Sequence, residues 1–186
     1  NLAAVCAVEA GPEGLFRLGI QVEGEAGTFV ERVAYPLLPL AAPLQGDGAG
    51  DALVLGTTKG GVLERPHLWN PGRSAAGTQP GSLAAQFGCY YGAKGGVVTY
   101  CEDGAGHPKT LAAVRTAHGV VLTWRHLMRH DLQEPVALAF PVVAGVFRGA
   151  AGAATDWRDG AAIYKTWALK QPWCARRLAE RDDLPA

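Results

Sequence analysis

Glycine and proline divide this chain into short apolar runs, and this division constrains its fold more than any other feature of the sequence. The chain has 25 glycines and 12 prolines in 186 residues, spread as turn signals between runs rich in valine, leucine and aromatic residues. Such spacing is typical of many short strands joined by turns. Hydrophobic residues make up 48% of the chain and charged residues 18%, a composition that supports a folded core. We therefore expect an all-β antiparallel sandwich.

The clearest strand pattern lies near the N-terminus. Residues 15–24 alternate, with Phe16, Leu18, Ile20 and Val22 on one face and polar residues on the other. Residues 24–27 supply a turn, so 28–35 reads as the return strand of a hairpin. Further strands are expected at 53–55, 62–63, 83–91, 96–101, 110–117, 119–129 and 135–147. Pro141 places the last of these at a sheet edge or a bulge.

Two segments rich in proline and glycine, residues 36–50 and 64–82, are expected to be surface loops. Long loops in compact domains usually serve a function or are covered by a neighbouring domain. Trp69 lies in the second loop, where its ring would either stack on a sugar or pack beneath the loop.

The pattern changes to a helix after residue 149. Thr155 or Asp156 can cap a helix that begins at Trp157 and that Pro172 ends. Its apolar stripe recurs at helical period. The expected organisation is a β-sandwich over 1–149, a C-terminal α-helix packed on it within 150–174, and a charged linker over 175–186.

Composition argues against several classes of function. Lysine plus arginine and aspartate plus glutamate both number 17, so the positive field of a nucleic-acid binder is missing. The longest uncharged apolar stretch, residues 136–147, is shorter than the roughly 20 residues of a spanning helix. We thus expect neither a nucleic-acid nor a membrane partner.

The four cysteines lack metal-ligand spacing, so no metal and no cofactor are expected. Cys89 and Cys101 flank a predicted turn, where they are either a cross-strand disulfide or two buried thiols.

The predicted helix also carries a resemblance to a known family. Its segment Asp156–Trp173 (DWRDGAAIYKTWALKQPW) resembles the junction D-W-x-D/E-A-A-x-x-Y-R-x-W-A-L-K-Q-P-W of an uncharacterised bacterial family of glycoside-hydrolase-like proteins. Residues 34–38 are similar to that family's F/Y-P-x-L turn, and residues 86–109 to its central hairpin and D-x-x-G-x-x-K stretch. Gly160 departs from the pattern, which has alanine there.

The resemblance implies a galactose-mutarotase-like β-supersandwich that precedes a catalytic (β/α)8 barrel, an arrangement shared with the more distant endo-α-N-acetylgalactosaminidases. The implied function is that of a non-catalytic accessory domain of a carbohydrate-active enzyme, with the barrel and carbohydrate as partners and a secreted or periplasmic location favoured. Two alternatives stay open: an independent carbohydrate-binding module and an aldose-epimerase-like enzyme.

Candidate residues follow from the chemistry of sugars. Glycosidases need two carboxyl groups across the substrate, and the adjacent pair Glu102 and Asp103 would point to opposite faces of a strand, so no catalytic residue is assigned. Asp103, His107 and Lys109 share one loop and are candidate sugar contacts with Trp69; the alternative is a hydrogen-bonded turn. His126 and His130 are expected in the core or at an interface.

The aromatic residues of the C-terminal segment are expected to dock the helix and to form a seat for the next domain: Trp157, Tyr164, Trp167 and Trp173. This predicts an exposed apolar patch beside the helix.

Overall fold

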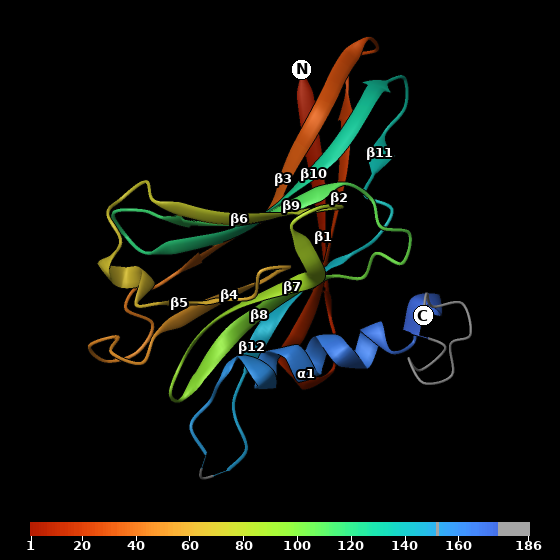
Figure 1. Ribbon diagram of the computed structural model, residues 1–186. Helices are drawn as coiled ribbons and strands as arrows, with labels where there is room; N and C mark the ends of the chain where they lie inside the picture. Colours follow the sequence, from red (N-terminus) through yellow and green to blue (C-terminus); the bar gives the residue numbers. More distant parts are fainter. Residues whose placement is uncertain (152, 175–186) are drawn as a thin grey trace.

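The computed structural model describes residues 1–151 and 153–174, which form two antiparallel sheets and one α-helix (Figure 1). The large sheet has the order β1 (Leu2–Ala10), β2 (Leu15–Gly24), β12 (Val142–Phe147), β8 (Gly95–Cys101), β7 (Leu83–Gly92), β4 (Ala52–Thr57) and β5 (Val62–Glu64), with β11 (Val136–Ala137) also on β2. The small sheet has the order β3 (Thr28–Leu40), β10 (Val120–Leu132), β9 (Lys109–Arg115) and β6 (Ser74–Gln79). The helix α1 spans Trp157–Ala168, and 3-10 helices lie at Pro12–Gly14, Pro66–Leu68 and Pro172–Cys174. This confirms the predicted all-β sandwich with one C-terminal helix.

The large sheet is covered on both faces along its central strands. The small sheet covers one face, and α1 lies along the other (Figure 1). Residues of β7 alternate between the two layers: Tyr90 joins the core between the sheets, whereas Cys89 and Tyr91 join the core beneath the helix. Because a strand buried on both faces needs few polar residues, β7 is apolar along most of its length.

The core between the sheets is centred on Trp124 of β10. Its ring is fully buried, and its indole N–H donates to the Thr99 hydroxyl of β8 over 3.0 Å. This bond satisfies the one polar atom of the largest core side chain and ties the two sheets together.

The start of α1 follows the sequence prediction. Asp156 is the N-cap: its carboxylate accepts from the Arg158 amide, while the Asp159 carboxylate accepts from the Asp156 amide in a capping box. Half-buried Trp157, Ala161, Tyr164 and Trp167 pack on the core beneath the helix. The first three belong to the predicted apolar stripe, whose fourth member, Ala168, is not part of this cluster. Residues 175–186, the expected linker, lie outside the described residues.

The predicted hairpin of residues 15–35 is wrong. Strand β2 pairs with β1 and β12 in the large sheet, whereas β3 pairs with β10 in the small one. Val22 of β2 and Val30 of β3 share a core cluster with Leu132. Their apolar faces therefore pack face to face rather than side by side. Alternation records only which face of a strand is buried, and both arrangements satisfy it.

Three further boundaries differ from the sequence prediction. Strand β3 continues to Leu40 through Pro36 and Pro39, which it tolerates because it is an edge strand. The predicted loop 64–82 contains β6. Residues 135–147 form two strands, and β12 is central, with Pro141 just before it. Strand β1 was missed, since its alanine-rich sequence alternates weakly.

The cysteine question is settled in favour of free thiols. All four cysteines are unpaired, and Cys89 and Cys101 belong to different core clusters on opposite faces of the large sheet. Burial raises the pKa of the Cys89 thiol to about 12 and also raises the pKa of Cys101. Both are therefore inert packing residues.

Among the residues that the structure describes, no helix is both long and apolar enough to cross a lipid bilayer.

The close approach of α1 to the sheet explains Gly160 and gives a first prediction. A Cβ at this position would lie 3.2 Å from Cζ of Phe147 and 3.4 Å from Cβ of Cys89. Gly160→Leu should therefore lift the helix and lower the free energy of unfolding by about 1–3 kcal/mol. Ala162→Leu, on the exposed side of α1, is the control and should change it by less than about 0.5 kcal/mol. Urea denaturation measures both; equal effects would contradict the tight helix–sheet contact.

Candidate functional site

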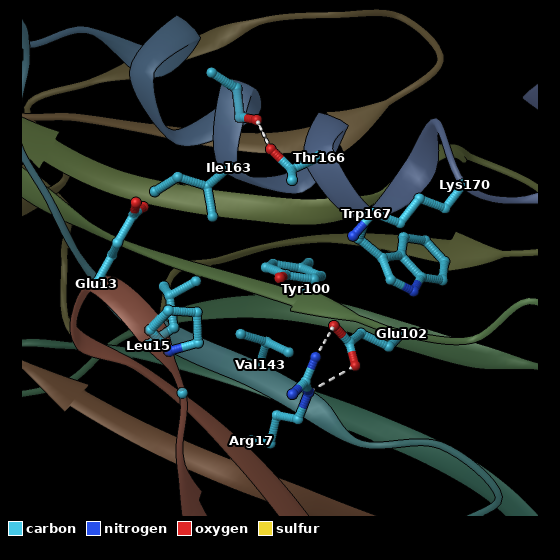
Figure 2. Close-up of a pocket in the computed structure, with 13 residues that line it drawn as sticks. Glu13, Leu15, Arg17, Tyr100, Glu102, Val143, Ile163, Thr166, Trp167 and Lys170 are labelled. Carbon is cyan, nitrogen blue, oxygen red and sulfur yellow. Dashed lines mark hydrogen bonds and ion pairs between the residues drawn. The ribbon is translucent and has the colours of Figure 1, made fainter.

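A groove of about 610 Å³ lies between α1 and the large sheet (Figure 2). Strand β2 contributes Leu15 and Arg17 to its lining, β8 contributes Tyr100, and Glu102 directly follows β8. The rest of the lining includes Glu13, Val143, Ile163, Thr166, Trp167 and Lys170. The groove thus combines apolar and aromatic walls with a few charged groups, the usual composition of a binding site.

An ion pair between Arg17 and Glu102 lies at one end of this groove (Figure 2). Arg17 Nε donates to Oε2 of Glu102 over 3.0 Å, and its terminal nitrogen donates to Oε1 over 3.2 Å. The hydrogen bond and charge of Glu102 raise the pKa of Arg17 above its usual value. A two-point pair of this kind fixes both side chains in one orientation. Neither was predicted as part of a binding site.

Aromatic contacts hold α1 on the sheet beside the groove, and of the residues that make them Tyr100 and Trp167 line it. The Tyr164 ring stacks on Phe87 of β7 with 5.7 Å between centroids and meets Tyr100 edge-on at 5.7 Å. Trp167 lies 6.4 Å from Tyr100 and 5.8 Å from Trp173. Such aromatic pairs contribute stabilising free energy to the docking of α1 in addition to that from the apolar area they bury.

The predicted loop residues Asp103, His107 and Lys109 do come together. The buried Asp103 carboxylate accepts from the amides of Ala105, Gly106 and His107, from Nδ1 of His107 over 2.8 Å, and from the Lys109 ammonium. Lys109 is also fully buried, donates to the His107 carbonyl over 2.7 Å, and lies 4.9 Å from the centroid of Phe140.

This arrangement matches the hydrogen-bonded turn that was the alternative for these residues. Burial by itself raises the pKa of Asp103, but the hydrogen bonds from Lys109 and His107 outweigh it and hold the pKa below the usual value. The carboxylate is thus an anion that closes the loop. Of the three side chains, only the His107 ring is exposed. Since its Nδ1 faces Asp103, its Nε2 is the atom free to meet a ligand.

Trp69 is not brought to this loop. It is buried in the core between the sheets, and the Arg73 guanidinium lies 4.7 Å from its ring centroid. The ring packs under its own segment, which was the alternative to sugar stacking.

The two other histidines of interest lie near Phe140. His126 is buried, with Nε2 donating to the Tyr35 carbonyl over 2.7 Å, whereas His130 is exposed. Burial lowers the pKa of His126 to about 4, so its ring is neutral at physiological pH. With His107, these residues line a cavity of about 240 Å³.

A second cavity, of about 300 Å³, lies on the α1 side of the loop and is lined by Gln86, Gly104, Tyr164 and Trp173. Gln86 Nε2 donates to the Asp103 carbonyl over 2.9 Å, while its Oε1 has no hydrogen-bond donor among the described residues. Trp173 is 48% exposed. The sequence offered little indication that Gln86 lines a cavity, because a polar residue in an apolar strand has many possible roles.

The described part of the chain contains no group of three or more histidine, cysteine, aspartate or glutamate residues that could hold a metal ion. In comparisons with known proteins, no family model matches the sequence and no curated protein does.

The buried Asp103–Lys109 pair gives a second prediction. Asp103→Asn leaves the buried Lys109 ammonium without its counter-charge and should cost about 3–5 kcal/mol in unfolding free energy. Lys109→Met should cost less, because Asp103 keeps its amide donors and His107. In the double variant part of the loss should be recovered, as urea denaturation of the four proteins would show. Strictly additive losses would mean that the two charges do not depend on each other.

The low pKa of His126 gives a third prediction. The unfolded chain takes up a proton at this histidine near pH 6.5, but the folded chain does so only near pH 4. The contribution of the neutral His126 ring to the free energy of unfolding is therefore fully present above pH 6.5. It should be lost as the pH drops toward 4, lowering the free energy of unfolding by about 3 kcal/mol. Asp103, whose folded pKa is depressed, adds a further loss at still lower pH.

His126→Gln should flatten the loss between pH 6.5 and 4, since an amide can still donate to the Tyr35 carbonyl but does not titrate. His118→Gln, at an exposed position, is the control. Unfolding curves at several pH values decide the matter: an unchanged pH profile in His126→Gln would contradict this assignment.

Proposed function

We propose that this chain is a non-catalytic β-sandwich domain of a carbohydrate-active enzyme of the glycoside-hydrolase-like type, and that its α1 surface supports a (β/α)8 catalytic barrel. The observation that carries the proposal is the construction of α1 itself. The helix bears the junction motif that resembles that family, and its aromatic residues dock it on the sheet, where Trp167 also lines an open groove.

The surface at the C-terminal end of α1 is suited to a neighbouring domain. Leu169 and Trp173 are about half exposed, at 58% and 48%. The Arg17–Glu102 pair and Lys170 lie along the adjacent groove. An apolar centre with charged groups at its rim is the usual composition of an interface between domains.

The geometry of Glu102 favours an anchoring role over acid–base catalysis. Both of its oxygens are held by Arg17, whereas a glycosidase acid must give up a proton to the leaving group. Glu13, the other carboxylate of the groove, is exposed in a 3-10 turn. The groove therefore has more of the character of a contact surface than of a reaction centre.

A second candidate, carbohydrate binding by the sandwich alone, is favoured by the cavity beside the Asp103 loop. The exposed indole of Trp173 offers a flat apolar surface to a sugar ring, and Gln86 Oε1 accepts no hydrogen bond from residues 1–151 and 153–174. The Asp103–Lys109 pair would then hold the loop in position. His126 does not support the aldose-epimerase alternative as an acid catalyst, because its Nε2 donates to the Tyr35 carbonyl.

A fourth prediction tests the supporting role. If α1 carries an interface, the chain alone should bind the apolar dye anilinonaphthalene sulfonate there. Replacing Leu169 and Trp173 together with serine should lower dye fluorescence clearly more than replacing Leu37 and Val62, which are similarly exposed on other elements. A polypeptide extended through a following barrel domain should lose the α1 contribution. Equal dye binding by all variants would contradict an interface on α1.

A fifth prediction concerns activity and sugar binding. The chain should hydrolyse no aryl glycoside, because both oxygens of the groove carboxylate Glu102 are held by Arg17. Turnover that disappears in Glu102→Gln would overturn this. Calorimetric titration with neutral oligosaccharides separates the two candidates: affinity that Trp173→Ala abolishes and Leu169→Ala retains would put the binding-module function first.

A further inference from the structure

Strand β1 is an edge of the large sheet, and no other strand of the described part of the chain pairs with its outer side. Every one of its residues is exposed, including Leu2 at 61%, Val5 at 57% and Val8 at 65%. Leu2, Val8 and the exposed Phe16 of β2 lie on one face of the sheet, and Val5 lies on the other. The apolar patch was expected beside α1, where Leu169 and Trp173 are exposed. In Figure 1 the strand lies at the opposite end of the large sheet from β4 and β5.

The register of β1 on β2 shows which backbone groups point outward. The pairing matches residues whose numbers add to 26, as in Leu2 with Gly24 and Ala10 with Phe16. The Glu25 amide donates to the Asn1 carbonyl and the Gly11 amide donates to the Leu15 carbonyl, so odd-numbered residues of β1 bond to β2. In an antiparallel ladder the alternate residues face the other side. The N–H and C=O groups of Leu2, Ala4, Cys6, Val8 and Ala10 therefore face the free edge.

The edge carries few of the usual protections against pairing. Natural edge strands are blocked by proline, lysine, bulges or short length. Strand β1 spans nine residues, pairs with β2 without a register shift, and contains no proline or lysine. Its one charged residue, Glu9, lies opposite Arg17 of β2.

We propose that two copies of this chain pair through β1, antiparallel, with the two-fold axis at Cys6, so that their large sheets become one continuous sheet. Antiparallel pairing requires that outward-facing residues meet outward-facing residues. A two-fold axis at any residue of the strand meets this condition, so the register is chosen by how much of the strand it pairs, and Cys6 is the middle residue. This register pairs the whole strand, whereas an axis at Ala4 or Val8 would leave about half of it unpaired.

Side chains are compatible with this register. Leu2 lies opposite Ala10 of the second copy, Ala4 opposite Val8, and Ala3 opposite Glu9. The two Glu9 carboxylates lie near opposite ends of the shared ladder, so like charges do not meet. Each large side chain meets a small one. The contact is isologous and closes after two copies, which distinguishes it from open-ended edge aggregation. The inference does not depend on the proposed carbohydrate function.

The register makes Cys6 a specific reporter. At the two-fold axis, the two Cys6 Cα atoms would be about 5.5 Å apart. In a Cys174→Ser background, where the remaining Cys89 and Cys101 are buried, a short bismaleimide should join two copies through Cys6. Moving the thiol to position 4 (Ala4→Cys with Cys6→Ser) separates the two thiols by about 13 Å along the strand and should largely prevent the cross-link. Equal cross-linking at both positions would overturn the register.

Light scattering on the uncross-linked chain tests the association itself. The mass should rise toward twice 19.5 kDa as the concentration approaches about 0.5 mM. Val8→Pro removes an outward N–H and spares the bonds to β2, so it should give a monomer; Ala4→Lys, which keeps every amide, should do the same. Leu37→Lys, at another exposed apolar position, should not. Circular dichroism checks that each variant folds. A wild-type chain that stays monomeric, or a dimer that survives both edge variants, would overturn the proposal.

Discussion

The structure depends on burial of the central strands of the large sheet on both faces. Strands β7 and β8 are apolar almost throughout, so one covering layer would leave half of their side chains in water. The small sheet covers one face and α1 covers the other. The hydrogen bond from Trp124 to Thr99 fixes the first contact, and the close approach at Gly160 fixes the second. Because α1 has to lie at this place, the groove along its side is a consequence of the fold.

The candidate site is organised by charges that the protein itself neutralises. The Arg17–Glu102 pair lies at the surface, where such pairs contribute little stability but set the shape of the groove end. The Asp103–Lys109 pair is buried, where removal of one partner is costly, and it fixes the loop that separates the two cavities. In the supporting role proposed for the sandwich, these groups would position the surfaces that meet a neighbouring domain.

The two contact surfaces proposed for this chain lie on different parts of the large sheet. The α1 surface presents side chains, among them Leu169 and Trp173. The β1 edge presents backbone groups. Side-chain surfaces select a partner by shape and chemistry, whereas a strand edge selects by register and length. A second copy at β1 and a neighbouring domain at α1 would therefore not compete for the same residues.

The sequence by itself determined the class of fold, most of the strand positions, and the helix with its Asp156 cap, since these depend on local periodicity and on local hydrogen bonds. It also brought Asp103, His107 and Lys109 together, because they share one loop. Only the tertiary structure decided that β2 and β3 face each other, since alternation does not identify a strand's partner. Only the tertiary structure also decided that Trp69 is buried and that Arg17 pairs with Glu102, because those two residues are 85 positions apart in the sequence. Strand β1 was missed because an edge strand exposed on both faces has no core to impose an alternating pattern on its residues.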